Sequence, residues 1–490
     1  MDRPLTLYEA GALSDPPSHT SQKDTTMTLT SPDPIASDPL ASAEYLRAAL
    51  GDRVALPGEE AYDAFRRPWN RAIDQRPFAL AFPSSAEDVV DIVRAAVATG
   101  LRVAPQSTGH AAAALADTDL SRTILLWMGR LRGVTVNAEH RTARVLGGSH
   151  WNDVVAEAAP VGLTALHGSA GDVSVVGYTL SGGLSFYARA HGLAVGSVRS
   201  VTMVTADGRL VTADEKDNAE LFWAVRGGSG AFGVIVSLEI DLLPYADVFA
   251  GMLLWDVSHA TRVSHAWREW TTTAPESATT ALRILHFPPD PALPPFLSGR
   301  SVVVIDGAIL EADADADALL QPLRELAPEI DTFRRIPAGE LIAVHMDPPA
   351  PTPSVTAHAM LAELTADVVN AFVSTASAPS PMMAELRHVG GAAARPCGDG
   401  AVAALEGEYL LAAIGMIPEP HMADVARALT RGLVETMSSW RAPSLALTFI
   451  DGGVENTAGF GDAAPRLSVL KSQFDSANLF AAANPIPRAS

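Results

Sequence analysis

The sequence is poor in cysteine and in positive charge. Cys397 is the one cysteine among 490 residues, so the chain cannot form an internal disulfide or a cysteine-rich zinc site. Lys and Arg number 35 against 56 Asp and Glu, which gives a net charge of −21. This negative field repels phosphate backbones and anionic lipids, and we expect neither nucleic acid nor a membrane as a partner.

Long hydrophobic runs are also missing. No stretch reaches the roughly 18 consecutive apolar residues of a membrane span, and no basic segment followed by an apolar one opens the chain. We therefore expect a cytoplasmic protein. Residues 1–40 are rich in Ser, Thr, Pro and Asp with little apolar periodicity, which predicts a disordered tail. With 48% hydrophobic residues overall, the rest can form two or three domains.

The clearest local pattern is a β-α-β unit. A capping box at 83–87 precedes one apolar helical face that ends at Gly100, and residues 78–82 and 101–104 on either side are strand-like. The unit delivers the chain to residues 105–111, directly after a strand.

The chain beyond this unit combines predicted short strands, Pro-rich loops and a helical stretch. From about residue 250, Pro-rich loops and an Ala/Asp-rich helical stretch indicate a second domain. Short strands are predicted at 123–127, 142–146, 201–204 and 210–212; the loops lie at 288–297 and 347–354, and the helical stretch at 311–327.

The run Gly228–Gly233 satisfies the G-x-G-x-x-G pattern of nicotinamide-binding proteins. That fingerprint requires a strand before it and a helix after it. Here residues 219–225 are helical in pattern and residues 234–240 alternate like a strand. The context therefore argues against a classical Rossmann site.

Two runs of small residues are candidate ligand-binding segments. Backbone N–H groups of residues 106–110 could cradle a diphosphate, although His110 taken alone is also explained as a turn histidine bonded to backbone. The glycines at 177–183 would let a ligand approach the backbone, but glycines within strands also mark bulges.

Other catalytic signatures are absent from the sequence. It has no G-x-S-x-G elbow and no H-E-x-x-H, and its histidines lack metal-ligand spacing, so serine hydrolases and zinc enzymes fit poorly and no metal site is expected. The stretch Glu385 to Pro396 contains Arg387, His388 and Arg395. Ion pairs or catalysis could each account for its polarity.

In combination, these segments resemble the PCMH-type FAD-binding module of the vanillyl-alcohol-oxidase superfamily, and its berberine-bridge-enzyme-like branch in particular. The resemblance covers about residues 77–244, the segment 471–487 is similar to the family's closing segment, and residues 250–440 match only loosely. The matching motifs are the helix start at 83–90, Thr-Gly-His at 108–110, Val-Gly-Tyr-Thr-Leu-Ser-Gly-Gly at 176–183, His-Gly-Leu-Ala at 191–194, Val-Thr-Ala-Asp-Gly at 204–208, and the residues at 221–235.

The resemblance implies an α+β fold: a PCMH-type FAD-binding domain of two α+β subdomains, and a substrate domain with an antiparallel sheet covered by helices. The implied domains are an FAD-binding domain at 41–250, a substrate domain at 251–440 and a returning C-terminal segment at 441–490.

It also implies one covalent bond between FAD and His110, because Ala170 stands where some members have a linking cysteine. Gln106 and Thr108 depart from the usual residues of the loop, and Val173 falls near the position that the family uses to control oxygen access to the flavin. The implied cofactor-binding residues are Gln106, Ser107, Thr108, Gly109, His110, Ala111, Gly168, Val173, Gly177, Ser181, Gly182, Gly183, Ile235 and Asn478.

The implied activity is that of an oxidase. Hydride would pass from a C–H bond of a small alcohol, sugar or secondary metabolite to flavin N5, and O2 would reoxidise the flavin to give H2O2. A dehydrogenase with another acceptor and an inactive flavin-binding protein are the alternatives. Arg395 and Ala446-Leu447 stand where the family has its base, which leaves Tyr409 and His388 as candidates. The oligomeric state stays open.

Overall fold

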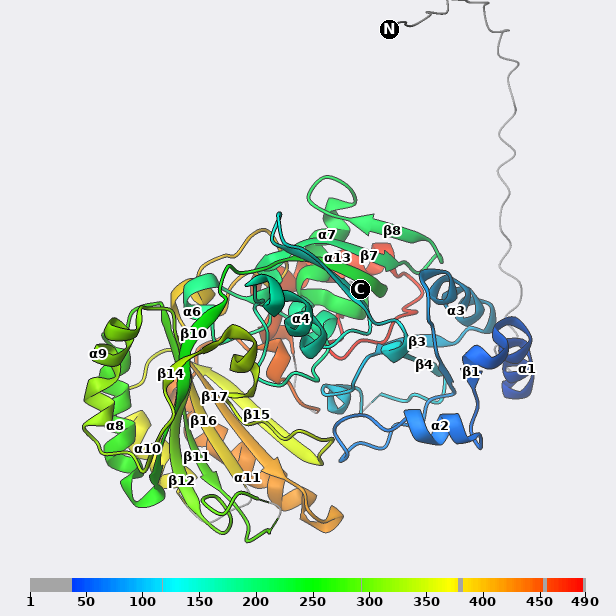
Figure 1. Ribbon diagram of the computed structural model, residues 1–490. Helices are drawn as coiled ribbons and strands as arrows, with labels where there is room; N and C mark the ends of the chain where they lie inside the picture. Colours follow the sequence, from blue (N-terminus) through cyan, green and yellow to red (C-terminus); the bar gives the residue numbers. More distant parts are fainter. Residues whose placement is uncertain (1–37, 117, 292, 378–381, 453–455, 488–490) are drawn as a thin grey trace, which may run out of the picture.

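The computed structural model describes residues 38–487, apart from 117, 292, 378–381 and 453–455. Two sheet-containing halves lie side by side, with residues 38 to about 241 in one half and a large sheet in the other (Figure 1). The predicted tail at 1–40 falls mainly outside the described residues, and helix α1 begins at Pro39.

The first half opens with a four-stranded sheet in the order β1-β2-β4-β3. Its predicted helix is confirmed as α3: the Ser85 hydroxyl accepts a hydrogen bond from the Asp88 backbone N at 3.1 Å, and Gly100 closes the helix with φ +61°. The elements are α1 (Pro39–Leu50), β1 (Val54–Ala55), α2 (Glu60–Phe65), β2 (Ala79–Ala81), α3 (Ala86–Thr99), β3 (Arg102–Gln106) and β4 (Thr123–Trp127).

A five-stranded antiparallel sheet, β5-β6-β9-β7-β8, completes this half. The G-x-G-x-x-G run lies between helix α7 and strand β9, the reverse of a Rossmann context, as predicted. The elements are β5 (Val134–Asn137), β6 (Thr142–Leu146), α4 (Trp151–Ala158), α5 (Val175–Leu180), α6 (Ala188–His191), β7 (Val198–Val204), β8 (Leu210–Ala213), α7 (Ala219–Gly228) and β9 (Val234–Asp241).

The glycine-containing run at 177–183 is not a strand. Ser174 caps helix α5, and its hydroxyl accepts from the Gly177 backbone N. Gly182 and Gly183 then turn the chain with positive φ. The strand-bulge interpretation is therefore wrong, because a Ser N-cap starts a short helix here.

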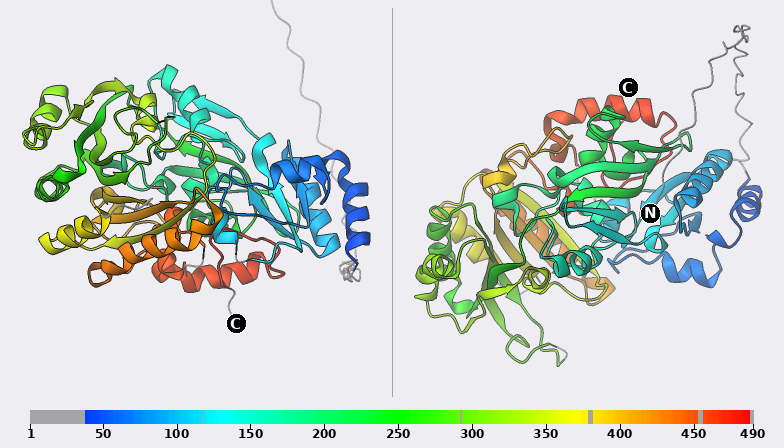
Figure 2. Two further views of the ribbon diagram at one scale, coloured as in Figure 1. Left: turned by 90° about the horizontal axis from the view of Figure 1, so that it is seen from below. Right: turned by 45° about the horizontal axis from the view of Figure 1, so that its top comes forward.

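The second half is built on an eight-stranded sheet, β13-β10-β12-β11-β16-β17-β15 with β14 beside β10. Helices cover one face of this sheet, and the other face looks toward the first half (Figures 1 and 2). The elements are β10 (Asp247–Asp256), α8 (Ala260–Thr271), β11 (Ala278–His286), β12 (Ser301–Ile309), α9 (Asp313–Arg324), β13 (Ile330–Asp331), β14 (Arg334–Pro337), β15 (Ser354–Leu361), α10 (Ala366–Ala376), β16 (Met382–His388), β17 (Tyr409–Met416) and α11 (Ala423–Thr436).

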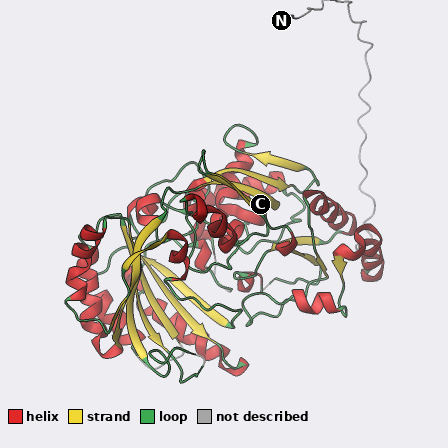
Figure 3. Cartoon of the chain, in the orientation of Figure 1, coloured by secondary structure: helices red, strands yellow, loops and turns green. Residues whose placement is uncertain are grey.

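The C-terminal segment returns to the first half through α12 (Thr457–Phe460) and α13 (Ala464–Phe474). Phe480 forms a parallel bridge with Val103 of β3, and the backbone N of Val103 donates to Leu479 O at 2.8 Å. Helix α13 packs against α7 of the first half, and Figure 3 distinguishes the helices from the strands in both halves. Among the helices described, none combines the length and the apolar character needed to cross a membrane.

Candidate active site

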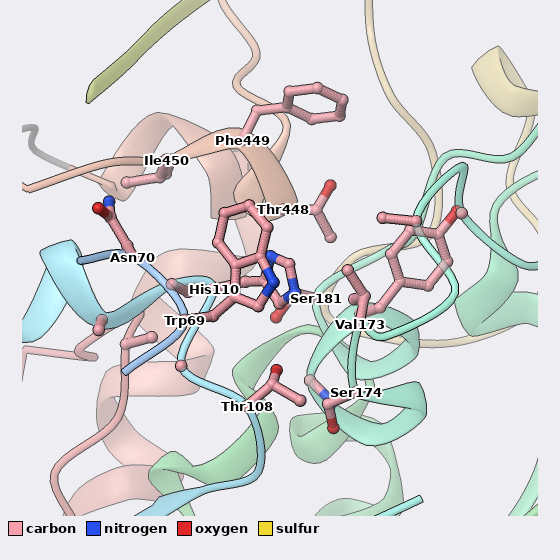
Figure 4. Close-up of a pocket in the computed structure, with 18 of the residues that line it drawn as sticks. Trp69, Asn70, Thr108, His110, Val173, Ser174, Ser181, Thr448, Phe449 and Ile450 are labelled. Atoms are coloured by element: carbon pink, nitrogen blue, oxygen red, sulfur yellow. The ribbon is translucent and has the colours of Figure 1, made fainter. Parts of the chain in front are cut away.

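A cavity of about 420 Å³ lies between the two halves. One wall is the loop after β3 and the segment before α5; the other is the free face of β15, β16 and β17 with residues 447–451. The side chains of Trp69, His110 and Thr448 gather in this cavity (Figure 4). It has the size of a small-molecule site.

Packing against Pro68 fixes the course of the loop after β3. Gly109 has φ +82°, and a Cβ there would lie 2.5 Å from the Pro68 Cβ, so only glycine fits without a shift. The Ser107 hydroxyl donates to Gly148 O at 3.2 Å, and Gln106 exchanges side-chain hydrogen bonds with Gln75. These contacts hold the loop in its position.

His110 is clamped between an indole ring and a carboxylate. Its imidazole stacks on Trp69, with ring centroids 4.1 Å apart and planes at 21°. Its Nε2 lies 3.3 Å from Asp172 Oδ1, and the Trp69 Nε1–H donates to Asp172 Oδ2 at 2.5 Å. Burial raises the pKa of Asp172, but these contacts lower it more, so its pKa lies below the ordinary value.

The structure brings most of the expected cofactor residues to this one cavity. Three do not line it: Gly182, Gly183 and Asn478. Gly183 instead allows close packing, because a Cβ there would lie 2.6 Å from the Tyr178 ring, and Asn478 lies beyond α13, where its backbone O accepts from Arg102. Those that line the cavity are Gln106, Ser107, Thr108, Gly109, His110, Ala111, Gly168, Val173, Gly177, Ser181 and Ile235.

Tyr409 and His388 lie on the helix-covered face of the sheet and do not line the cavity. They are paired across β16 and β17, and their rings stack at 5.2 Å. The Tyr409 hydroxyl bonds to Thr271 Oγ1 at 2.8 Å, and His388 Nε2 contacts Arg189 at 2.7 Å. Alternate residues of a strand face opposite sides of the sheet, and both Tyr409 and His388 occupy positions that face away from the cavity. This corrects the expectation that one of them acts as the base.

Their neighbours of opposite parity do face the cavity. Glu385 and Arg387 of β16 line it, and Arg387 Nε donates to Glu385 Oε1 at 2.7 Å. Behind them, Arg283 pairs with Asp306, whose Oδ2 lies 3.1 Å from His345 Nδ1. The ion-pair interpretation of this stretch is thus correct for Arg387. Glu385 and Arg387 are two residues apart in a strand, and this spacing indicates that their side chains lie on the same face of the sheet.

The buried network fixes the charge of its members. Burial alone would lower the pKa of His345, but the charges of Asp306, Asp347 and Glu385 raise it to about 9. Burial opposes ionisation of Glu385, yet Arg387 and His345 hold its pKa well below the usual range. At neutral pH the imidazole is therefore charged and the carboxylate is a weak base.

Part of the first half matches a known protein family. Residues 77–214 match the family model "FAD binding domain". The chain is 34% identical over 209 residues to (R)-6-hydroxynicotine oxidase of Paenarthrobacter nicotinovorans, which covers 42% of this chain and 45% of that protein, so the chain matches less than half of its relative's length.

Solved structures share the fold over nearly the whole chain. Physcomitrella patens BBE-like 1 has a TM-score of 0.80 at 20% identity, covering 92% of this chain and 99% of its own. A second structure is that of glucooligosaccharide oxidase from Acremonium strictum, which has a 6-S-cysteinyl, 8α-N1-histidyl FAD. Its TM-score is 0.76 at 19% identity, and the match covers 91% of this chain and 100% of that chain.

The half that contains the match to an FAD binding domain faces a sheet-based half across the cavity. The chain thus carries an FAD binding domain and has the PCMH-type fold of the berberine-bridge-enzyme-like proteins, which confirms the resemblance seen in the sequence.

Proposed function

We propose that the chain is an FAD-dependent oxidase of a small molecule that carries its flavin on His110. The observation that carries this proposal is the clamped imidazole, which lies on the FAD-binding half and faces the cavity shared with the sheet. Nε2 lies 3.3 Å from Asp172 Oδ1, within ion-pair distance although not in hydrogen-bond geometry. Asp172 would hold the proton on Nε2 and leave the Nδ1 lone pair free for attachment.

A single covalent link follows from the position of the one cysteine. Cys397 donates its S–H to Ala403 O at 2.9 Å and does not line the cavity. Ala170 lines the cavity and offers no nucleophile. Attachment through His110 alone is what these side chains support.

The protein's own contribution is positioning and exclusion of water. Gly109, Gly168 and Gly177 line the cavity without side chains of their own, so a flat ring and a diphosphate fit closely against backbone. When bound, the flavin supplies hydride acceptance from a substrate C–H bond and electron transfer to O2. The apolar lining beside it, including Val173, limits access by water.

Acid precipitation of the purified holoprotein tests the covalent link. Flavin colour should stay in the wild-type pellet and move to the supernatant for His110→Ala. The control, His140→Ala, alters an exposed histidine on another loop and should behave as wild type. Colour released from the wild-type pellet would contradict the proposal.

Anaerobic reduction followed by mixing with air tests oxidase behaviour. Rapid return of the oxidised spectrum with stoichiometric H2O2 is expected. Slow reoxidation in air, with fast reoxidation by a quinone dye, would instead identify a dehydrogenase.

A further inference from the structure

A line of aromatic rings leads from the cavity to the surface of the protein. It starts at Tyr178, which lines the cavity, and the ring of Trp151 lies edge-on to it with centroids 5.5 Å apart. His167 follows at 6.4 Å from Trp151, and Tyr187 at 6.0 Å from His167. Tyr245 then stacks on Tyr187 at 5.8 Å, with planes 7° apart. Each step is therefore a direct contact between neighbouring rings.

The middle of this line is closed to solvent, whereas its far end is open. The side chains of Trp151, His167 and Tyr187 are at most 2% exposed, so no soluble molecule reaches them. Tyr245 is partly exposed, as is His191 beside it. The line thus connects the cavity with the surrounding water through packed rings.

The three tyrosines differ in what can accept their phenolic proton. The Tyr178 hydroxyl has no hydrogen-bond partner among the described residues, and next to the Tyr187 hydroxyl lies that of Thr164, which is a poor base. The Tyr245 hydroxyl, in contrast, lies 2.9 Å from His191 Nε2. Burial lowers the pKa of His191, so at neutral pH its imidazole is uncharged and has a nitrogen that can accept a proton.

These differences give the line a direction. A phenol loses an electron far more readily when its proton can leave at the same time, which favours oxidation of Tyr245 over Tyr178 and Tyr187. The buried Trp151 Nε1–H has no acceptor among the described residues, so an oxidised Trp151 keeps its proton and stays a strong oxidant. The positive charge of Arg387 acts on Tyr178 and disfavours a second positive charge there. An oxidation that enters the line should come to rest at Tyr245.

We propose that this line is a path along which a one-electron oxidation that begins in the cavity moves to Tyr245. In the net step one electron passes from Tyr245 to the oxidant in the cavity, the phenolic O–H bond breaks, and the proton binds to His191 Nε2. Light-excited flavin is an oxidant of this kind, so the inference rests on the proposed function. A soluble reductant such as ascorbate can then return the electron to Tyr245, which keeps oxidative damage away from the cavity.

Illumination of the oxygen-free holoprotein with blue light, followed by electron paramagnetic resonance, tests the path. A tyrosyl radical is expected in the wild type. Tyr245→Phe keeps the ring and should lose this signal. The matched control, Tyr62→Phe, alters a buried tyrosine that is bonded to Pro77 O away from the line and should keep the signal. Absence of a tyrosyl radical in the wild type, or its survival in Tyr245→Phe, would overturn the proposal.

Two further variants separate electron transfer from a merely structural role. His191→Asn removes the proton acceptor, and Trp151→Phe keeps a ring that is much harder to oxidise. Both should lose the tyrosyl signal while the ratio of flavin to protein absorbance stays at the wild-type value. Trp440→Phe, which alters a tryptophan packed on the core of the other half, should keep the signal.

Two measurements on the wild type remain decisive if a variant does not fold. Formation of the radical should be slower in deuterium oxide, because a proton moves from Tyr245 to His191. Trp69, which stacks on His110, is the competing electron donor in the cavity. A tryptophan radical without any tyrosyl radical would place the oxidation there and overturn the path.

The same samples separate this proposal from the proposed function. Bound flavin without a tyrosyl radical would contradict the path alone. A tyrosyl radical together with flavin that acid releases would contradict only the covalent link to His110. A colourless protein would contradict the proposed function and the path with it.

Discussion

Gly109 determines whether His110 can face the cavity. Its φ of +82° and its contact with Pro68 each disfavour a side chain. Gly109→Ala should lower the free energy of unfolding by about 1–3 kcal/mol and reduce the flavin bound per protein. The measurement is urea unfolding together with the ratio of flavin to protein absorbance.

Gly58→Ala is the matched control for that prediction. Gly58 has a comparable φ of +95° but nothing within 4 Å of an added Cβ. It should share the conformational cost and keep full flavin content. Equal flavin loss in both variants would show that the contact with Pro68 is unimportant.

His358 gives the protein a pH-dependent stability. Its Nε2 accepts a hydrogen bond from the Ala446 backbone N at 3.1 Å, and burial lowers its pKa from 6.5 to about 4. The unfolded chain therefore binds a proton at a higher pH than the folded one. The free energy of unfolding should fall by about 2 kcal/mol as the pH decreases from 6.5 to 4.

His358→Gln should flatten this dependence, because Gln can accept the same bond without titrating. His421→Gln, at an exposed position, should keep the wild-type slope. Chemical unfolding at several pH values measures both, and an unchanged slope in His358→Gln would exclude His358 as its source.

At the scale of elements, a buried ion pair holds the C-terminal return. Lys471 of α13 donates to Asp475 Oδ2 and to Ala231 O, both at 2.6 Å, and Asp475 accepts from the backbone N of Leu479 and Phe480. Lys471→Met leaves a buried carboxylate without its cation. It should lower the free energy of unfolding by about 3–5 kcal/mol.

The exposed pair Arg427 and Asp424 provides the comparison. Arg427→Met should change the free energy of unfolding by less than about 0.5 kcal/mol, because exposed pairs contribute little. A similar loss in the two variants, measured by urea unfolding, would argue against a special role for Lys471.

Elements with strong local signals could be predicted from the sequence. The serines before the apolar face and Gly100 placed α3, although the structure has a Ser85 N-cap without the predicted capping box. The small residues at 106–110 marked the loop at the cavity. Sequence could not settle Tyr409 and His388, because their side of the sheet depends on strand parity and on helices that pack from elsewhere in the chain. The network of Arg283, Asp306 and His345 could not be predicted from the sequence either, because its members come from distant segments of the chain.

At the scale of the whole molecule, Asn70 joins the two halves at the edge of the cavity (Figure 4). Its Nδ2 donates to Ser354 O at 3.0 Å, and its Oδ1 accepts from the Ser354 backbone N at 3.2 Å. Asn70→Ala should lower the free energy of unfolding by about 1–3 kcal/mol. It should also speed hydrogen exchange in β15 more than in β12.

Asn137→Ala removes a comparable local contact on the surface, to the backbone N of His140, and serves as control. Exchange that rises equally in β12 and β15 would indicate general destabilisation instead of loosening between the halves.

The bridge between Val103 and Phe480 joins segments that leave the ribosome far apart in time. The cavity has walls from residues 105–112 and from 482–484, so its enclosure awaits the last part of the chain. Flavin loading should therefore be a maturation step that follows translation, and nascent chains arrested before residue 480 should emerge without colour.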